Sequence, residues 1–81
     1  MTLLPIETLD LRGLKCPLPV LRARKYLSKQ EHGHQVTILT TDPLAVIDIP
    51  HMCHEDGHSC AAPTKLEAEH HFHITVGDAV V

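Results

Sequence analysis

The residue with the clearest chemical potential is Cys16, which comes directly before a stretch that contains Pro17 and Pro19. Proline is tolerated in the first turn of a helix, where backbone N–H groups have no partners within the helix. The two prolines therefore predict that a helix begins just after Cys16. A thiol at this place lies near unpaired N–H groups and the positive end of the helix dipole, and both favour the thiolate. We expect a lowered pKa at Cys16, and the thiolate is the form that exchanges sulfur and acts as a nucleophile.

Two basic residues, Arg12 and Lys15, come shortly before the cysteine. They would favour the thiolate further if their side chains fold toward the sulfur. Pro17 and Pro19 would hold the backbone, so that the sulfur is presented in one geometry. The alternative is that Cys16 is a small buried apolar residue that only happens to precede a helix.

The predicted helix after Cys16 has one apolar and one basic face. Val20, Ala23 and Leu27 share a face at i, i+3 and i+7 spacing. The opposite face carries basic residues, which could dock an acidic partner protein or could simply be solvated, and Leu18 projects near it as a further partner contact. These candidate partner-binding residues are Leu18, Arg22, Lys25 and Lys29.

The other thiols and the histidines offer a second kind of chemistry. The chain has 8 histidines, and several of them cluster with Cys53 and Cys60 between residues 51 and 60. Such residues ligate zinc or copper, but the spacing is not that of a paired metal site, so we predict no metal site and keep metal binding as an alternative. Core-filling thiols are the plain interpretation of Cys53 and Cys60, and a resolving cysteine is the other.

The elements that must position these residues can be read from the chain. Alternation predicts a strand over 6–11, a helix follows over 20–30, and a β-branched run predicts a central strand over 36–40. A second helix starts at Asp42-Pro43, is interrupted or kinked at Pro50 and ends by Gly57. Two strands follow, a weak one over 59–65 that contains Pro63 and a stronger one over 69–76. The order βαβαββ predicts an α/β (α+β) two-layer sandwich, with both helices on one face of a four-stranded mixed sheet.

Composition narrows the classes of function. The 81 residues are enough for a single domain, 1–81, and their net charge of −3 argues against a nucleic-acid coat. The longest apolar run is far too short to span a membrane, and the first five residues show no secretory signal. Three cysteines are too few for a disulfide scaffold, which favours reduced thiols in the cytoplasm.

The segment from Leu9 to Val20 resembles the Cys-Pro-x-Pro signature of the TusA/SirA-like sulfur-carrier proteins. In this sequence it reads Asp-Leu-Arg-Gly-Leu-Lys-Cys-Pro-Leu-Pro from Asp10 to Pro19, and Arg24-Lys25 follow. The similarity continues through Asp42-Pro43, Asp48-Ile49-Pro50 and Gly57-His58, so it covers nearly the whole chain.

This resemblance implies a βαβαββ sandwich like the C-terminal domain of translation initiation factor three. It further implies that Cys16 accepts sulfane sulfur as a persulfide from a cysteine desulfurase or a rhodanese and passes it to an acceptor protein. No dissociable cofactor, nucleic acid or membrane is expected to take part, and the carrier is expected to be a monomer. Whether such a relay counts as an enzyme is a matter of definition, and the sequence leaves open a non-catalytic regulatory or metal-binding interaction module on the same fold.

Overall fold

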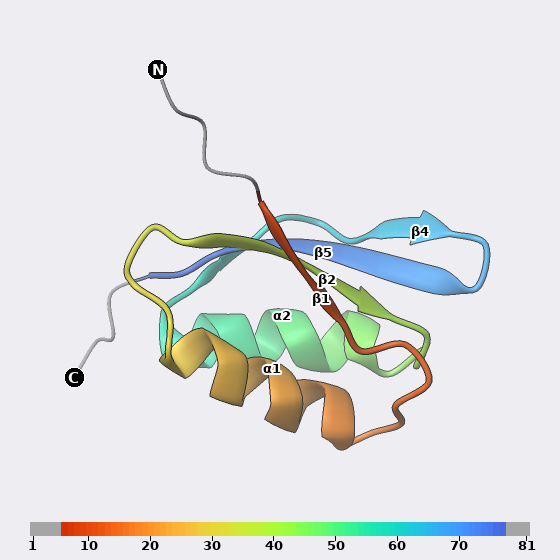
Figure 1. The fold of residues 1–81 in the computed structure, drawn as a ribbon. Coiled ribbons are helices and arrows are strands. Elements are labelled where there is room, and N and C mark those ends of the chain that lie inside the picture. Colours follow the sequence, from red (N-terminus) through yellow and green to blue (C-terminus); the bar gives the residue numbers. More distant parts are fainter. Residues whose placement is uncertain (1–5, 78–81) are drawn as a thin grey trace.

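The computed structural model describes residues 6–77, so the expectation about the first five residues lies outside the described part. Within 6–77 the chain forms two helices and five strands (Figure 1). In chain order they are β1 (Glu7–Asp10), α1 (Leu18–Ser28), β2 (Gln35–Thr40), α2 (Ala45–Asp56), β3 (Ser59–Cys60), β4 (Thr64–Leu66) and β5 (Glu69–Thr75).

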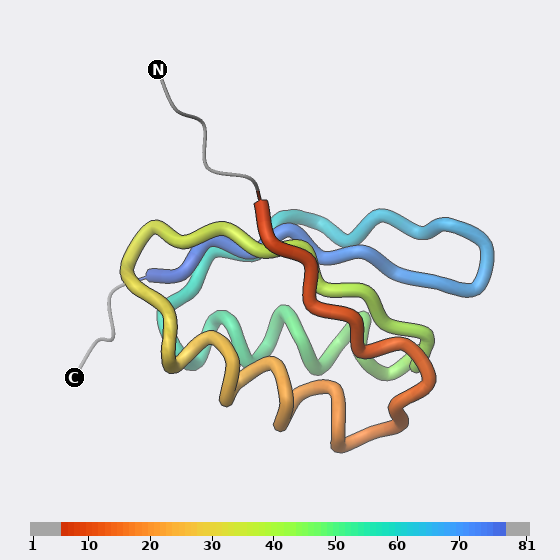
Figure 2. Tube along the Cα trace, viewed as in Figure 1, coloured from red at the N-terminus to blue at the C-terminus, as the bar shows by residue number. Residues whose placement is uncertain are grey.

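The strands form one mixed sheet, and both helices cover the same face of it (Figures 1 and 2). Strand β1 runs parallel to β2, β2 pairs antiparallel with β5, and both β3 and β4 pair antiparallel with β5. The predicted two-layer α+β class is therefore confirmed. Because β1 and β2 are parallel and each is followed by a helix, the starts of α1 and α2 lie at the same end of the sheet.

The predicted strand over 59–65 is divided into two short strands, and this division accounts for the fifth strand. Strand β3 pairs with the end of β5 and β4 with its beginning, and residues 61–63 separate them along the same edge. Pro63 has no backbone N–H to give to the ladder, which explains why pairing stops there. All four predicted strands are present, but the third of them, over 59–65, forms as two separate short strands, β3 and β4.

The helix boundaries differ slightly from the predicted ones. The Cys16–Pro17 peptide is cis, Pro17 is the N-cap and α1 begins at Leu18. Helix α2 runs without a break through Pro50, so of the predicted interruption or kink the interruption is wrong. It ends at Gly57, as predicted, and Gly57 has the positive φ of +82° that closes many helices.

The core lies between the helices and the covered face of the sheet. Phe72 and Ile74 of β5, and Val76 directly after it, are buried and alternate with exposed or half-buried neighbours, which matches the predicted alternation. The fully buried side chains come from every layer and include Ala23, Leu27, Ile38, Ile49, Met52 and Phe72. Neither of the helices described within 6–77 is long and apolar enough to cross a membrane.

Candidate functional site

The loop that carries Cys16 is fastened to the start of α2. Leu11 extends the β1–β2 ladder by donating its N–H to the Leu39 carbonyl at 2.9 Å, and the Gly13 N–H donates to the Thr41 hydroxyl at 2.9 Å. The Cys16 N–H then donates to Oδ2 of Asp42 at 2.6 Å. These bonds fix the backbone that leads from β1 to the thiol.

Asp42 holds two segments with one carboxylate. Its Oδ2 accepts the Cys16 N–H, and its Oδ1 accepts the Leu44 N–H at 3.1 Å. The second bond resembles the capping that the sequence predicts for Asp42, although the helix proper begins later, at Ala45. Asp42 therefore joins the cysteine loop to the beginning of α2.

The thiol itself is exposed and faces a second carboxylate. The Sγ of Cys16 donates to Oδ2 of Asp48 at 3.6 Å. A narrow cleft surrounds it, lined by Cys16, Pro17, Pro19, Val20, Asp42, Ala45 and Asp48. Pro17 and Pro19 thus line the same cleft as Cys16.

The electrostatic surroundings of Cys16 are the reverse of those expected. Partial desolvation, followed by the hydrogen bond and charge of Asp48 and the charge of Asp42, raises the pKa of the Cys16 thiol. The prediction of a lowered pKa is therefore wrong for the free chain. The helix start is present, but Asp48 accepts a hydrogen bond from the sulfur and Asp42 accepts one from the Cys16 N–H, and no hydrogen bond from a cation to the thiol is found among residues 6–77.

Arg12 does not turn toward the sulfur. Its guanidinium binds both carboxylate oxygens of Asp10, at 2.9 and 2.8 Å, and Oε2 of Glu69 at 3.1 Å. Arg12 lowers the pKa of Asp10 to about 2. It ties the end of β1 to β5, while Lys15 is exposed. Neither side chain contributes a recorded contact to the thiol.

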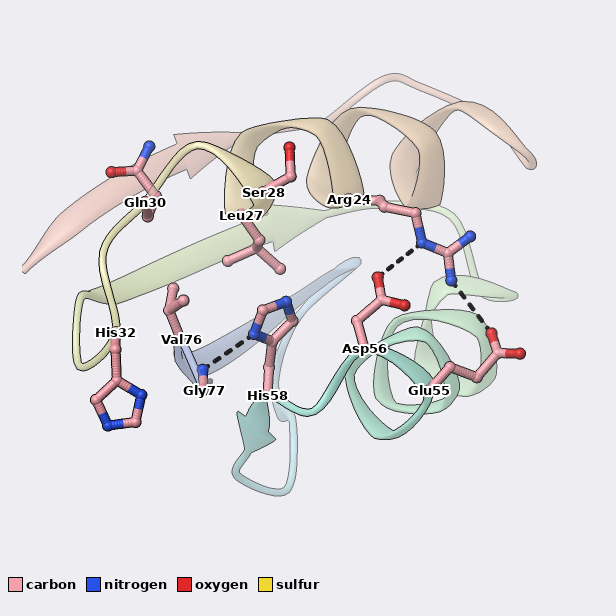
Figure 3. A pocket seen from close by; sticks show the side chains of 10 residues that line it. All are labelled: Arg24, Leu27, Ser28, Gln30, His32, Glu55, Asp56, His58, Val76 and Gly77. Atoms are coloured by element: carbon pink, nitrogen blue, oxygen red, sulfur yellow. Dashed lines mark hydrogen bonds and ion pairs between the residues drawn. The ribbon is translucent and has the colours of Figure 1, made fainter. Parts of the chain in front are cut away.

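Arg24, a basic residue of α1, forms ion pairs within the chain. Its Nε binds Oδ2 of Asp56 at 2.8 Å and its Nη2 binds Oε1 of Glu55 at 3.2 Å (Figure 3). These bonds join α1 to the last turn of α2 beside a cavity of about 430 Å³, whereas Cys16 lies before the start of α1. By contrast, the candidate partner-binding residues Arg22, Lys25 and Lys29 are exposed, and Leu18 is 43% exposed.

Sequence reasoning missed the two carboxylates at the thiol and part of the apolar surface around it. Asp42 was interpreted as a cap and as part of a family motif, and Asp48 only as part of a family motif. A usable signal existed, because helices that follow two neighbouring parallel strands begin at the same edge of a sheet. Four large apolar residues are also exposed on the first turns of the two helices, of which only one was predicted: Leu18, Leu21, Leu44 and Ile47.

The metal-binding alternative finds no support in the described part of the chain. Among residues 6–77, no group of three or more His, Cys, Asp or Glu side chains is arranged to hold a metal ion. The histidines are distributed instead over separate contacts. For example, His73 of β5 is hydrogen-bonded to Thr37 at 3.0 Å and His58 accepts the Gly77 N–H at 3.1 Å.

Comparison with known proteins agrees with this architecture. The family model described as Sulfurtransferase TusA matches residues 7–76. Two proteins of Neisseria meningitidis, one from serogroup A and one from serogroup B, are named as candidate sulfur carrier proteins. Each is 50% identical to this chain over 52 residues, which are 64% of this chain and 70% of the relative. The crystal structure of a SirA-like protein from Desulfitobacterium hafniense superimposes with a TM-score of 0.76 at 28% identity, covering 90% of this chain and 100% of that one. With its signature cysteine at the start of α1 and a family match across nearly the whole sheet, this chain belongs to the TusA sulfurtransferase family.

Proposed function

We propose that this sulfur-carrier family member holds its cargo as a persulfide on Cys16. The observation that carries the proposal is the exposed Cys16 thiol, whose backbone N–H is fixed by Asp42 at 2.6 Å. A relay needs a sulfur atom that a partner can reach and a rigid mount that presents it in one orientation. Pro17 and Pro19, which line the cleft at the sulfur, support the second requirement.

The transfer consists of two sulfur exchanges. The Cys16 thiolate attacks the terminal sulfur of a persulfide on a donor protein, such as a cysteine desulfurase or a rhodanese. The donor's S–S bond breaks, its own cysteine leaves as the thiolate, and Cys16 becomes the persulfide. An acceptor thiolate then attacks the terminal sulfur on Cys16, and Cys16 leaves as the thiolate. All the atoms come from the three thiols and the transferred sulfur, so the exchange needs no cofactor.

Asp48 gives the relay a resting state. Together with partial desolvation, which is the larger cause, its carboxylate at 3.6 Å from Sγ raises the pKa of Cys16 and so favours the thiol over the thiolate in the free chain. A cationic side chain on a docked donor would offset this charge and release the thiolate only in the complex. In this proposal the free carrier is protected from reaction with unrelated electrophiles.

We further propose that Leu18, Arg22, Lys25 and Lys29 form the docking ridge for an acidic partner surface. All four are exposed, three of them on α1 and Lys29 at its C-cap, and the ridge starts beside the reactive cysteine. Arg24 is excluded from the ridge because Asp56 and Glu55 occupy its guanidinium. Charge complementarity of this kind mainly accelerates encounter and favours the correct partner.

The same proposal treats the chain as one domain, 1–81, that acts as a monomer in the cytoplasm. A persulfide relay works through free thiols, which a reducing compartment maintains. Cys16, Cys53 and Cys60 are all free in the structure, which supports this assignment.

Intact-mass analysis after incubation with a cysteine desulfurase and cysteine tests the proposal. The wild-type chain should gain about 32 mass units, one sulfur atom, and a reducing thiol should remove the gain. Cys16→Ser should gain nothing, whereas Cys60→Ser, which keeps the signature cysteine, should be labelled like the wild type. Labelling of Cys16→Ser to the wild-type extent would refute Cys16 as the carrier residue.

Charge reversal tests the docking ridge separately. Lys25→Glu should slow sulfur loading severalfold at low salt and less at high salt, because screening weakens steering by exposed charges. The matched control is Lys65→Glu on β4, which makes the same charge change on an exposed residue outside α1. Equal loading rates for the two variants would remove Lys25 from the proposed ridge.

The alternative function, an interaction module without sulfur chemistry, makes a different prediction. Such a module would keep partner binding in Cys16→Ala and would show no sulfur loading in the wild type.

A further inference from the structure

Large apolar side chains are exposed at the starts of both helices, around the signature cysteine. Six such side chains are exposed among residues 6–77, and four of them lie at these helix starts. Leu18 is 43% and Leu21 is 54% exposed on α1, and Leu44 is 52% and Ile47 is 68% exposed on α2. We call these four residues the apolar rim. Single exposed leucines are common on protein surfaces, whereas several gathered at one place are typical of an interaction surface.

The side chains of the apolar rim point to the same side of the molecule. Leu21 and Ile47 each come two positions before a fully buried residue, Ala23 in α1 and Ile49 in α2. Two positions turn a helix by about 200°, so both side chains point away from the sheet. The other two rim residues precede them by three positions and therefore share their sides of the helices. Because both helices cover one face of the sheet and start at the same end (Figure 1), the rim lies on the outer side of the helix layer.

The cleft that contains Cys16 lies between α1 and α2, with half of the rim on each side. Val20 of its α1 wall is next to Leu21 in sequence, and Asp48 of its α2 wall is next to Ile47. The cleft has no room for a water molecule, so no side chain of a partner can enter it. A protein that brings a sulfur atom to Cys16 must therefore rest on the surface around the cleft, which includes the apolar rim.

We propose that the apolar rim binds the segment of the sulfur donor that carries the donor's persulfide cysteine, an inference that rests on the proposed function. Transfer brings the donor's terminal sulfur into bonding contact with Cys16, so the residues beside the donor's cysteine must cover the surface around Cys16. Burial of this apolar surface is favourable against apolar side chains. The bound segment therefore has apolar residues on both sides of its cysteine.

The charges at the centre of the rim add a second requirement for this partner. Asp42 accepts the Cys16 N–H at 2.6 Å and Asp48 accepts the thiol hydrogen bond at 3.6 Å, so two carboxylates lie where the donor's cysteine arrives. Covering them with purely apolar residues would desolvate negative charge without pairing it, which is costly. The segment therefore also carries a basic residue beside its cysteine, in contrast to the acidic surface that fits the docking ridge farther along α1.

Loading rates from two sulfur donors test the rim. One donor is a cysteine desulfurase that already carries its persulfide, and the other is glutathione persulfide, which is too small to cover the rim. We expect Leu21→Gln and Ile47→Gln each to lower the ratio of the first rate to the second severalfold, at low and at high salt, because salt does not screen apolar contacts. The matched control is Leu66→Gln on β4, which is 51% exposed and should keep the wild-type ratio. An unchanged ratio in either rim variant would overturn the proposal.

The same experiment separates this proposal from the sulfur-carrier proposal. If neither donor loads Cys16 in the wild-type chain, the carrier proposal fails and the rim loses its occupant with it. If both donors load Cys16 and the ratios are all equal, only the rim proposal is wrong. Sedimentation tests the other occupant, a second copy of this chain. A dimer that forms in the wild type and is lost in Ile47→Gln would contradict the donor segment as the occupant.

Two synthetic peptides test the requirement for a basic residue. Each is a symmetric disulfide of a peptide with one cysteine between leucines, next to an arginine in one peptide and a glutamate in the other. In the Cys60→Ser chain the Cys16 thiolate attacks one sulfur, the S–S bond breaks, one peptide leaves as the thiolate and the other stays on Cys16 as a mixed disulfide. Each rate is divided by that of the same peptide with reduced glutathione. We expect the arginine peptide to react severalfold faster, and Asp48→Asn to shrink this advantage, whereas equal normalised rates would overturn the requirement.

Discussion

At the scale of single residues, the environment of Cys16 depends on where charges lie rather than on which charges are near in sequence. Arg12 is only four positions from Cys16, yet it binds Asp10 and Glu69. Asp48 is distant in sequence, yet its carboxylate accepts the thiol hydrogen bond at 3.6 Å. A helix start favours the thiolate by an amount that nearby carboxylates can offset.

Asp48→Asn should make Cys16 react faster, not slower, with iodoacetamide at neutral pH. The substitution removes a negative charge that raises the pKa of Cys16, so a larger fraction of the thiol is ionised. We expect a severalfold higher rate and a pH profile whose midpoint moves to lower pH. Glu67→Gln, which removes an equal charge in the β4–β5 turn, is the control and should leave the rate unchanged. A slower rate in Asp48→Asn would mean that Asp48 acts as a base.

The Arg12 ion pairs should be visible in the acid limb of the stability curve. The pKa of Asp10 is lowered to about 2, so this carboxylate stabilises the fold above its unfolded pKa of about 3.9. That stabilisation is lost as the pH falls toward about 2. In Arg12→Gln, urea unfolding from about pH 5 to pH 2 should show a shallower loss than the wild type. Arg22→Gln, on the exposed side of α1, should follow the wild-type curve.

At the scale of elements, proline and glycine in the sequence were largely sufficient to predict where the two helices start and end. Pro17 and Pro19 predicted the start of α1 to within two residues, because proline cannot occupy most other helical positions. Pro50 was misjudged, since α2 continues through it with Ile49 fully buried and Asp48 at the thiol. Tertiary packing of that helix evidently outweighs the missing hydrogen bond, which a sequence pattern cannot show.

Gly57→Ala should destabilise the fold by about 1–2 kcal/mol, the cost of placing a Cβ in the left-handed region. Gly57 has φ +82° and donates its N–H to the last turn of α2. Gly57→Asn should lose less, because asparagine tolerates this conformation better. Chemical denaturation of the three proteins measures the difference. Equal stability of the alanine variant and the wild type would show that α2 can end in another way.

At the scale of the whole molecule, a small two-layer fold depends on few side chains. Phe72 is fully buried between the sheet and the helices, while its neighbour His73 points to the uncovered face. Phe72→Ala should cost about 3–5 kcal/mol, a large share of the stability of a domain this size. His73→Ala, one residue away on the same strand, should cost no more than about 1 kcal/mol. Thermal unfolding of both variants measures the contrast.

The architecture was more predictable from sequence than the site. The alternation of apolar and polar residues in β5 and the apolar face of α1 predicted the sheet layer and the helix layer. Burial on one face makes apolar residues recur at a regular spacing along each element. The carboxylates at Cys16 depend on where separate segments meet, which no local pattern encodes. The exposed basic residues Arg22 and Lys25 of α1 were identified because a helix has a definite outer face, whereas the exposed Leu21 on the same helix was missed.

The backbone at Gly77 lies so close to the backbone of Gly57 that position 77 has no room for a side chain. A Cβ built on Gly77 would lie 1.8 Å from the carbonyl oxygen of Gly57 and 2.9 Å from its carbon. Backbone cannot swing aside as a flexible side chain can, so every other amino acid at position 77 would force the strand end away from the helix terminus. In a library with all twenty residues at this position, selection for folded protein should return glycine almost alone.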